Sequence, residues 1–523
     1  MNSIELTLFH QRLDAICDEM GLTLQRAAFS PNIKDRLDYS CAIFDRYGSL
    51  RAQAAHIPVH LGSMAYAMAD LVKRFDWQEG DMVWVNDPFL GGTHLPDITV
   101  IAPVFIDDTL CGFVANRAHH ADIGAESAGS MPIASRLLQE GVVIAPTRFM
   151  KNGAPEEDVI APVLKQLRNP DHGRADLIAQ ASANVVGCKR LTVLVKQLGS
   201  LEKYYSALEA LNDYGRRMAR SGIGAIPNGD YQFTDVMDDD GQGNRDIAVS
   251  LQLKIDDDAV IADFSGSALQ VVGNINCPVS VVAAAVYYAF RCLMPANTPA
   301  CAGSFSSISL VVPYGSFLNP EPGAAVAAGN VETSMRLVDV VMGALAQALP
   351  DKLPAASQGT MNNVALGSVG DVGSNKAAVA WDYYETLAGG AGAGPNGDGA
   401  SGIQLHMTNT QNTPVESVEM HYPLRISRYQ LISQRGTEAG DENVGGRGLI
   451  REYEFLQDTQ VTLLTERRTR PPWGLHGAKA GKEGENKLDD ELLPGKTSLI
   501  AKAGQRLSIQ TPSGGNWRLP KGL

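Results

Sequence analysis

The sequence predicts a mixed α/β (α+β) protein of several domains, with mixed sheets, a central helical segment and a β-rich, glycine-rich C-terminal part. Its 523 residues exceed what one hydrophobic core ordinarily supports. Helical and strand-like periodicities alternate along residues 3–348. The 52 glycines concentrate in the C-terminal half, and apolar residues continue between them. We therefore expect tight turns and close backbone approaches there rather than disorder.

Residues 1–160 are predicted to form a mixed helix and sheet domain. Apolar residues recur at helical spacing over residues 3–28. Strand-like runs follow at 39–45, 82–86, 98–105 and 109–116. Such alternation of one long helix with short apolar runs indicates a sheet that is covered by helices.

Changes of periodicity divide the remaining chain into three parts. Residues 161–225 are predicted to be a helical segment, with one or two helices over 175–220. Residues 226–400 are predicted to be an α/β domain that begins at the turn Pro227-Asn228-Gly229-Asp230. Its expected elements are strands near 231–236, 246–255 and 258–264 and helices at 279–293 and 331–348. Residues 401–523 are predicted to form short strands joined by glycine and proline turns.

The charge, the apolar runs and the cysteines exclude several classes of protein. A formal net charge of −14 disfavours binding to nucleic acid. The longest apolar run, Val279 to Phe290, is too short to span a bilayer, so no membrane association is expected. The N-terminus lacks the basic and apolar regions of a signal peptide. The seven cysteines contain no CxxC pair, so we expect a cytoplasmic protein without a disulfide framework.

Two segments match nucleotide-binding motifs only in part. Residues 392–397 fit GxGxxG, but Pro395 interrupts them and residues 398–402 cannot begin a firm helix. Gly495-Lys496-Thr497 matches the end of a phosphate-binding loop, but Asp490 occupies the position of its first glycine. The sequence therefore predicts no ATP site in this chain.

Histidines and aspartates gather in the N-terminal part. Five of the ten histidines lie between residues 56 and 120. A hairpin that turns at 107–108 pairs residues whose numbers sum to about 215, which places Asp97 opposite Ala118 and His94 opposite 119–122. Two imidazoles and a carboxylate at the open end of one hairpin suit a divalent metal ion. The alternative is that these aspartates cap turns and these histidines are hydrogen-bonded.

Strand geometry limits which neighbours can share one ion. Adjacent strand residues point to opposite faces, so His119 and His120 are not expected to bind together. Asp87 follows another strand-like run and can reach the same edge of the sheet. His56 and His60 are interpreted as core or turn residues.

Further motifs follow in a fixed order along the chain. In the N-terminal part they are Ser30-Pro31-Asn32 through Asp45, Asn86-Asp87-Pro88-Phe89, Gly91 through Asp97, and Ala118-His119-His120-Ala121-Asp122-Ile123-Gly124. Beyond these they occupy 139–141, 324–326, 329–334, 359–363, 383–386 and 407–410. With these motifs nearly the whole chain resembles the hydantoinase B and oxoprolinase family. Two departures are Ala125, where a second glycine is usual, and Met335, where glutamine usually precedes the arginine.

The resemblance implies a reaction shared by two chains. A partner of hydantoinase A type, an ATPase that uses ATP and magnesium, phosphorylates the substrate, and the B-type chain completes the reaction at a metal. The implied ligands of one divalent ion (zinc, manganese or iron) are His94, Asp97 and His119, with Asp38 as the candidate fourth. His120 and Asp122 are the candidate catalytic residues, which orient the ligands by hydrogen bonds or serve as acid and base.

The favoured function is the metal-binding B-type subunit of an ATP-dependent cyclic-amide hydrolase of the hydantoinase, 5-oxoprolinase or lactamase class. We expect a hetero-oligomer with the ATPase partner and a small cyclic-amide substrate. One alternative is a subunit of a ketone carboxylase of the acetone or acetophenone carboxylase type, and another is a non-catalytic scaffold subunit. Glu332 and Glu385 are interpreted as structural carboxylates that cap backbone donors. Residues 389–402 are interpreted as a long surface loop, with a lid over the site as the alternative.

Overall fold

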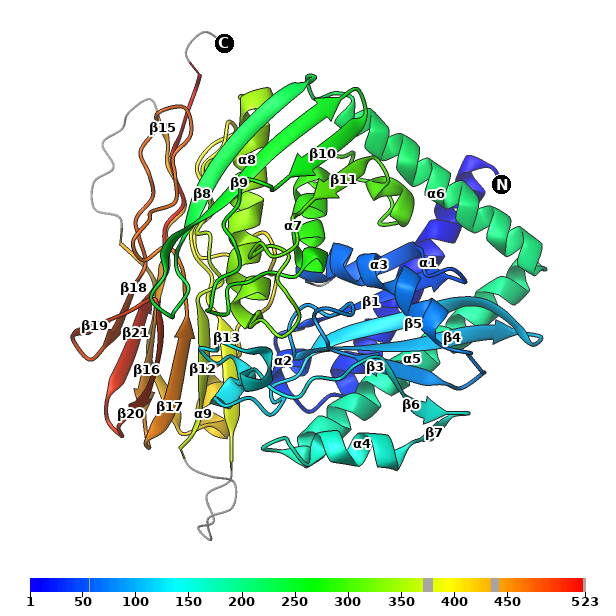
Figure 1. Cartoon of the computed structure of the whole chain (residues 1–523), viewed down its shortest axis with the longest axis horizontal. Helices are drawn as coiled ribbons and strands as arrows, with labels where there is room; N and C mark the ends of the chain where they lie inside the picture. The colour runs from blue at the N-terminus through cyan, green and yellow to red at the C-terminus, as the bar shows by residue number, and fades with distance from the viewer. Residues whose placement is uncertain (56, 370–379, 434–441, 521–523) are drawn as a thin grey trace.

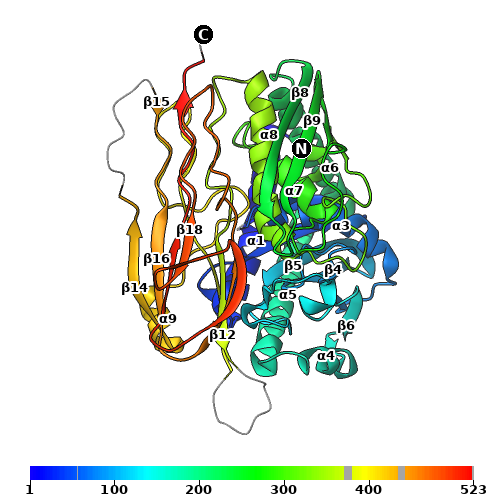
Figure 2. The same cartoon turned by 60° about the vertical axis from the view of Figure 1, so that its left-hand side comes forward.

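The structure, a computed structural model, describes residues 1–55, 57–369, 380–433 and 442–520. The N-terminal and middle elements form one side of the molecule, and the C-terminal sheets are stacked against them (Figures 1 and 2). Helices and sheets alternate in the first part and strands dominate the last, which confirms the predicted α+β class. His56, which was expected to be a core or turn residue, lies outside the described residues.

A seven-stranded sheet of the order β2-β1-β5-β4-β3-β6-β7 forms the N-terminal part. Its strands are β1 (Tyr39–Asp45), β2 (Leu50–Ala55), β3 (Met82–Val85), β4 (Asp97–Ile106), β5 (Thr109–His119), β6 (Thr147–Lys151) and β7 (Ala154–Pro155). Helices α1 (Ser3–Ala27), α5 (Pro170–Leu198) and α6 (Leu201–Ile223) share an apolar core with one face. Helix α3 (Val59–Leu71) covers the other face, and α2 (Pro31–Lys34) and α4 (Glu157–Leu164) are short. Because both faces are covered, the central strands are buried along nearly their whole length, including the polar Ser40, Asn116 and Arg117.

The hairpin of β4 and β5 differs from the prediction by one residue. Next to the turn, Ile106 pairs with Thr109 as expected, but a bulge between Val104 and Phe105 shifts the register. A bulge adds one residue to one strand, so every pair beyond it is displaced. Asp97 therefore lies opposite His119 rather than Ala118, which brings two of the predicted metal ligands face to face.

The predicted helical stretch 175–220 consists of two helices. Helix α5 ends where Gly199 adopts a left-handed conformation with a φ of 92°, which glycine tolerates at a helix end. Ser200 then caps α6 by accepting a hydrogen bond from the Lys203 N–H. The two helices can therefore turn back across the same sheet.

The middle part places one sheet against two helices. The sheet order is β11-β10-β9-β8, and the elements are β8 (Gly229–Asp239), β9 (Arg245–Asp256), β10 (Ala259–Asp263), α7 (Val279–Arg291), β11 (Ile308–Val311) and α8 (Ser334–Ala348). One turn of π-helix, η5 (Gly329–Thr333), precedes α8 and is buried throughout. Such turns are rare and recur at functional sites.

The C-terminal part contains two larger sheets and one small one. Their orders are β13-β12-β17-β20, β14-β16-β21-β18-β19 and β15-β22. The elements are β12 (Asn363–Ser368), β13 (Asp382–Thr386), α9 (Val415–His421), β14 (Leu424–Leu431), β15 (Glu442–Asn443), β16 (Leu449–Phe455), β17 (Thr459–Leu464), β18 (Glu485–Leu488), β19 (Glu491–Leu493), β20 (Lys496–Ala501), β21 (Arg506–Gln510) and β22 (Trp517–Arg518). The two larger sheets share one apolar core, as in a sandwich.

The glycine-rich stretch 389–402 is a loop that reaches the surface, as expected, but it is packed tightly against other segments, and none of its residues lines the histidine cavity. Its backbone is hydrogen-bonded to distant segments: Gly390 donates to Pro512, and the Gly446 N–H donates to Ala391. A Cβ on Gly392 would lie 1.9 Å from the carbonyl oxygen of Ala355. Only glycine allows backbones to approach so closely. Gly390 and Gly399 are as restricted as Gly392, because their Cβ atoms would lie 1.9 and 2.1 Å from carbonyl oxygens.

In the described part of the chain, none of the helices combines the length and the apolar character that crossing a membrane requires.

Two glycines of one loop test this packing. We expect Gly392→Ala to lower the free energy of unfolding by about 1–3 kcal/mol, because an added methyl group in a packed layer forces the backbone apart. Gly394→Ala is the matched control, since its Cβ would lie 3.7 Å from the nearest atom, the Pro354 Cβ. Urea unfolding of both variants measures the difference. Equal stabilities would contradict the close-packed assignment.

Candidate metal centre

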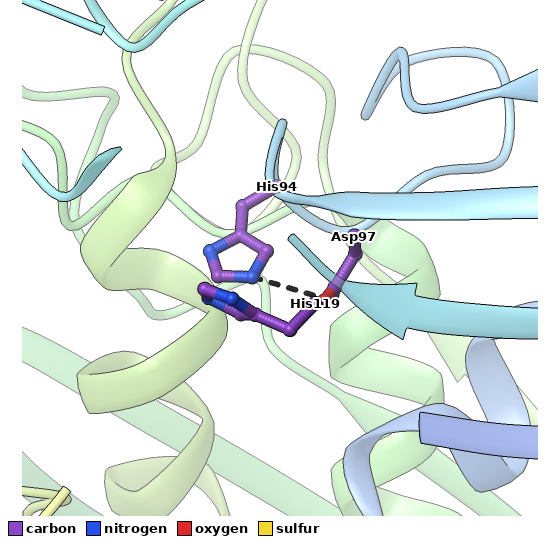
Figure 3. A group of neighbouring side chains, drawn as sticks. All are labelled: His94, Asp97 and His119. Carbon is purple, nitrogen blue, oxygen red and sulfur yellow. Dashed lines mark ion pairs between the residues drawn. The ribbon is translucent and has the colours of Figure 1, made fainter. Parts of the chain in front are cut away.

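Three buried side chains converge at the open end of the β4–β5 hairpin. They are His94, in the turn before β4, Asp97, the first residue of β4, and His119, the last residue of β5 (Figure 3). One potential ligand atom from each lies within 4.8 Å of the others. The two imidazole rings meet edge to face at 5.1 Å between centroids. The three residues predicted as ligands are therefore brought together.

Several polar atoms of this cluster lack protein partners. Among the described residues, both ring nitrogens of His94, Nε2 of His119 and Oδ1 of Asp97 have no hydrogen bond, although all are buried. His94 Nε2 lies 3.3 Å from Asp97 Oδ2, but the contact is not aligned as a hydrogen bond. Unpartnered buried polar atoms are costly. A divalent cation coordinated by these nitrogen and oxygen atoms would supply the missing partners. The residues present therefore fit a metal site.

The protonation states also suit metal binding. Burial raises the pKa of the Asp97 carboxyl, but His94 and His60 outweigh this and hold it well below its usual value. Burial, reinforced by His94, lowers the pKa of His119 well below its usual value. At neutral pH the cluster therefore offers a carboxylate and a neutral imidazole, which are the forms that bind metals.

Neighbouring side chains fix the orientation of His119 and Asp97. The ring of His119 stacks on Tyr384 at 4.8 Å, with an interplanar angle of 2°. Its Nδ1 lies 3.1 Å from the Asn32 amide, which leaves Nε2 available to a metal ion. Asp97 Oδ2 accepts a hydrogen bond of 2.5 Å from Thr93. Such contacts to metal ligands set their geometry and basicity.

His60 belongs to this site, which the sequence interpretation missed. Its Nε2 lies 3.4 Å from Asp97 Oδ2, and its Nδ1 lies 3.1 Å from the Ser40 hydroxyl. The clustering of histidines up to residue 120 was the one sequence feature that could have indicated a role for His60 in the site. Helix α3 carries His60 to the site, and no local periodicity reveals that packing.

Asp38 lines the same small cavity as the three clustered residues. Its backbone carbonyl accepts a hydrogen bond from the His119 N–H at 3.0 Å. Burial raises the pKa of its carboxyl despite the nearby Arg36 guanidinium. Leu37, just before it, has a φ of 58°, a conformation that is costly for a residue with a branched side chain and is found at constrained sites.

His120 and Asp122 point away from the cluster. His120 Nε2 contacts the Gln180 side-chain oxygen at 2.9 Å. The two oxygens of Asp122 accept hydrogen bonds from the N–H groups of Gly124 and Asn169 at 2.8 and 2.9 Å. These contacts orient the chain that follows β5. His119 and His120 do not converge, as the alternation of strand residues predicts.

Asp87 and the two glutamates have structural contacts. Asp87 accepts a hydrogen bond from the Phe89 N–H in a turn and does not line the cavity. Glu332 caps a backbone donor as expected, because its Oε1 accepts from the Met361 N–H at 3.0 Å. Glu385 differs from the expectation: its partners are the side chains of Arg451, Tyr453 and Asn412.

The cavity at the cluster is about 20 Å³ in volume. This suffices for one water-sized species. One wall comes from the N-terminal sheet, and the opposite wall comes from Asn330 of η5 and from the C-terminal residues Met361, Tyr384 and Thr410. The candidate centre is therefore closed by parts of the chain that are more than 200 residues away in sequence.

Residues 495–497, which match a phosphate-binding loop only in part, have a structural role. Lys496 is buried at the start of β20 and forms an ion pair with Glu466. Its ammonium group is thereby committed to a carboxylate and is unavailable for a phosphate.

Comparison with known proteins gives consistent matches. Residues 2–520 match the family model described as hydantoinase B/oxoprolinase. The chain is 37% identical to 5-oxoprolinase 1 of Arabidopsis thaliana over 98% of its own length, but it spans only 42% of that protein. It is 29% identical to a putative B subunit of a D-/L-hydantoinase from Pseudomonas sp. strain NS671, over 97% of this chain and 88% of that one.

Two solved structures share the fold. ATP-dependent caprolactamase from Pseudomonas jessenii superimposes with a TM-score of 0.89 and 26% identity, over 99% of this chain and 91% of that one. A nucleotide-free acetone carboxylase structure superimposes with a TM-score of 0.85 and 16% identity, over 98% of this chain and 75% of that one. The second match shows the fold alone.

Glu332 gives a pH-dependent prediction for stability. Burial raises its pKa from 4.5 to about 8, so between these values the unfolded chain is ionised at Glu332 while the folded chain keeps the proton. The free energy of unfolding should therefore fall as pH rises towards 8, by at most about 1.4 kcal/mol per pH unit. Glu332→Gln keeps an acceptor oxygen and removes this dependence.

Urea unfolding between pH 5 and pH 8 measures the difference, with Glu483→Gln as the control because Glu483 is exposed. The advantage of Glu332→Gln over wild type should widen with pH. An unchanged gap across this range would show that Glu332 is ionised in the folded protein.

Proposed function

The chain belongs to the hydantoinase B/oxoprolinase family, and on that premise we propose that it is the metal-dependent B-type chain of an ATP-dependent cyclic-amide hydrolase. The observation that carries the proposal is the cluster of His94, Asp97 and His119, whose buried ligand atoms lack partners among the described residues. The resemblance to an enzyme named ATP-dependent caprolactamase supports the substrate class.

The ion would be held by His94, Asp97 and His119, with Asp38 as the candidate fourth ligand from the same cavity wall. Zinc, manganese or iron suits two imidazoles and one or two carboxylates. Such an ion polarises a carbonyl or phosphoryl oxygen and provides hydroxide near neutral pH. This chemistry would need an open coordination position, which three protein ligands would leave on zinc and three or four would leave on six-coordinate manganese or iron.

The remaining residues of the site act by holding the ligands in place. Tyr384 and Asn32 fix the ring of His119, and Thr93 and His60 hold Asp97. For His120 the contacts favour positioning over acid–base catalysis. It binds Gln180, whose amide in turn donates to the Ile98 carbonyl of β4.

Asp122 has a similar role in the proposal. Both of its oxygens accept backbone hydrogen bonds, so it stabilises the turn after His119 and His120. Its oxygens are thereby directed at the backbone of that turn rather than at the cluster of His94, Asp97 and His119.

Activation by ATP is assigned to a partner chain. An amide carbonyl is a poor electrophile, and phosphorylation of its oxygen creates a leaving group. Neither nucleotide-like motif of this chain is suited to ATP, and this chain spans only 42% of the Arabidopsis 5-oxoprolinase, which therefore contains further sequence. A similar protein is named as one of the subunits of a hydantoinase. We therefore propose a hetero-oligomer with a hydantoinase A-type ATPase, which uses ATP and magnesium in the cytoplasm.

The closed cavity adds a condition to this mechanism. A volume of about 20 Å³ admits a water-sized species but not an amide ring, since pockets for small molecules measure hundreds of Å³. The wall that contains Met361, Tyr384 and Thr410 must therefore withdraw for the ring to reach His94 and Asp97.

Two other functions have less support. Acetone carboxylase shares the fold, but a match at 16% identity gives no support for the same activity in this chain. A non-catalytic scaffold would not need buried ligand atoms without partners at His94, Asp97 and His119.

We expect one divalent ion per chain in the purified protein. His94→Ala and Asp97→Ala should abolish binding, because each removes a ligand. Asn32→Ala should lower metal affinity about 10–100-fold, because it removes the contact to His119 Nδ1. Elemental analysis and competition with a chelator measure these effects, and the exposed His421→Ala is the control. Equal metal content in all variants would reject the centre.

The reconstituted pair of chains separates hydrolase from carboxylase. Ring opening needs only water, so turnover of hydantoins, 5-oxoproline or small lactams should be independent of bicarbonate and should be lost in His119→Ala. Product analysis with and without bicarbonate, with acetone and acetophenone as the competing substrates, provides the measurement. Strict dependence on bicarbonate with a ketone would establish the carboxylase instead.

A further inference from the structure

A second cavity, of about 660 Å³, opens beside the N-terminal end of α1. Its walls come from α1, from β2, from α6 and from the end of α7 with the segment 296–300. Figure 1 shows the N-terminus beside α6. No described residue lines both this cavity and the histidine cavity. Its volume is within the range of small-molecule sites.

Gln53 borders this cavity from β2 and has no hydrogen-bonding partner. Only 6% of its surface is exposed, and neither its Nε2 nor its Oε1 has a hydrogen bond among the described residues. A buried carboxamide can donate two hydrogen bonds and accept two. Burial of this carboxamide on the edge strand β2 without partners is costly unless a ligand supplies them.

Arg291, at the end of α7, supplies positive charge to the same cavity. Its Nη1 is buried and has no hydrogen bond among the described residues. Arg217 of α6 lines the cavity as a second guanidinium. The planar fork of an arginine matches the two oxygens of a carboxylate. The cavity therefore selects an acidic group.

The cavity also contains a negative charge and an apolar wall. Asp14 of α1 lies 3.3 Å from Nε2 of His10 in the same helix, and its outer oxygen can accept from an ammonium group. Leu6 and Leu211 supply apolar surface. Carboxylate, guanidinium, carboxamide and apolar side chains together match a molecule that carries both an ammonium and a carboxylate group.

We propose that this cavity is a binding site for a free amino acid, whose carboxylate binds Arg291 and Arg217 and whose ammonium group binds Asp14. Gln53 donates from Nε2 to a carboxylate oxygen and accepts at Oε1 from the ammonium group. The site is separate from the metal centre and does not depend on the hydrolase assignment.

Calorimetric titration of the full-length chain tests the proposal with L-glutamate, glycine, glutarate and inorganic phosphate. Glutamate should bind more tightly than glutarate, which lacks only the amino group, and phosphate should bind weakly. Arg291→Met should weaken glutamate binding at least tenfold. Asp14→Asn should remove the preference for glutamate over glutarate. Arg216→Met is the matched control, because Arg216 lies on the same helix, pairs with Asp213 and does not line the cavity.

Gln53→Met distinguishes a ligand-binding residue from a structural one. Methionine fills the space and removes the unpartnered amide, so the free protein should melt at a higher temperature while glutamate binding weakens. A lower melting temperature with unchanged affinity would overturn the role of Gln53. Absence of saturable binding by either amino acid, or binding of phosphate alone, would overturn the site.

Discussion

The buried guanidinium of Arg36 joins the two halves of the candidate centre, and the orientation of His119 depends on it. Its Nη1 donates to the Tyr384 carbonyl and its Nη2 to the Thr386 hydroxyl, each at 3.1 Å. The same guanidinium lies over the Tyr384 ring at 4.8 Å and contacts the Asn32 side chain. Tyr384 and Asn32 are the two groups that fix the His119 ring. One guanidinium from the N-terminal part thus holds the C-terminal wall and both side chains that orient His119.

A second set of buried charges fastens the middle part to the C-terminal sheets. Arg467 bridges Asp235 and Asp339 at 2.8 and 2.6 Å, and Arg336 reaches Glu466 at 3.2 Å. Burial raises the pKa of Asp235, but the two arginines outweigh it and lower the pKa to about 2. Removing one member would leave an unpaired buried charge, which costs far more than the pair contributes. These ion pairs oppose separation of the middle part from the C-terminal sheets, so the withdrawal of the cavity wall that the proposed function requires would be a local movement near Tyr384.

The segment that supplies Asn330 is held by two buried carboxyl groups. Glu140 accepts hydrogen bonds from the N–H groups of Val326 and Ala327, each at 2.9 Å, and Glu332 accepts from the far side. Burial raises the pKa of both glutamates to about 8. These contacts hold the π-helical turn against Asp97. Such turns are rarely adopted, so stabilising contacts of this kind are expected around one.

The sequence by itself predicted the α+β class and brought His94 and Asp97 to the same hairpin end as residues 119–122, because strand alternation and a two-residue turn are local constraints that hold wherever the hairpin packs. The choice of His119 from that segment came from the resemblance to the family. The tertiary structure decided the rest. The bulge at Cys111, between the partners of Val104 and Phe105, moved Asp97 from Ala118 to His119, and helix packing brought in His60. Tyr384 and Asn330 close the site from more than 200 residues away in sequence, and Gly390, Gly392 and Gly399 pack directly against distant backbone. Contacts between segments far apart in sequence arise from the packing of whole surfaces, and no periodicity within one segment encodes them.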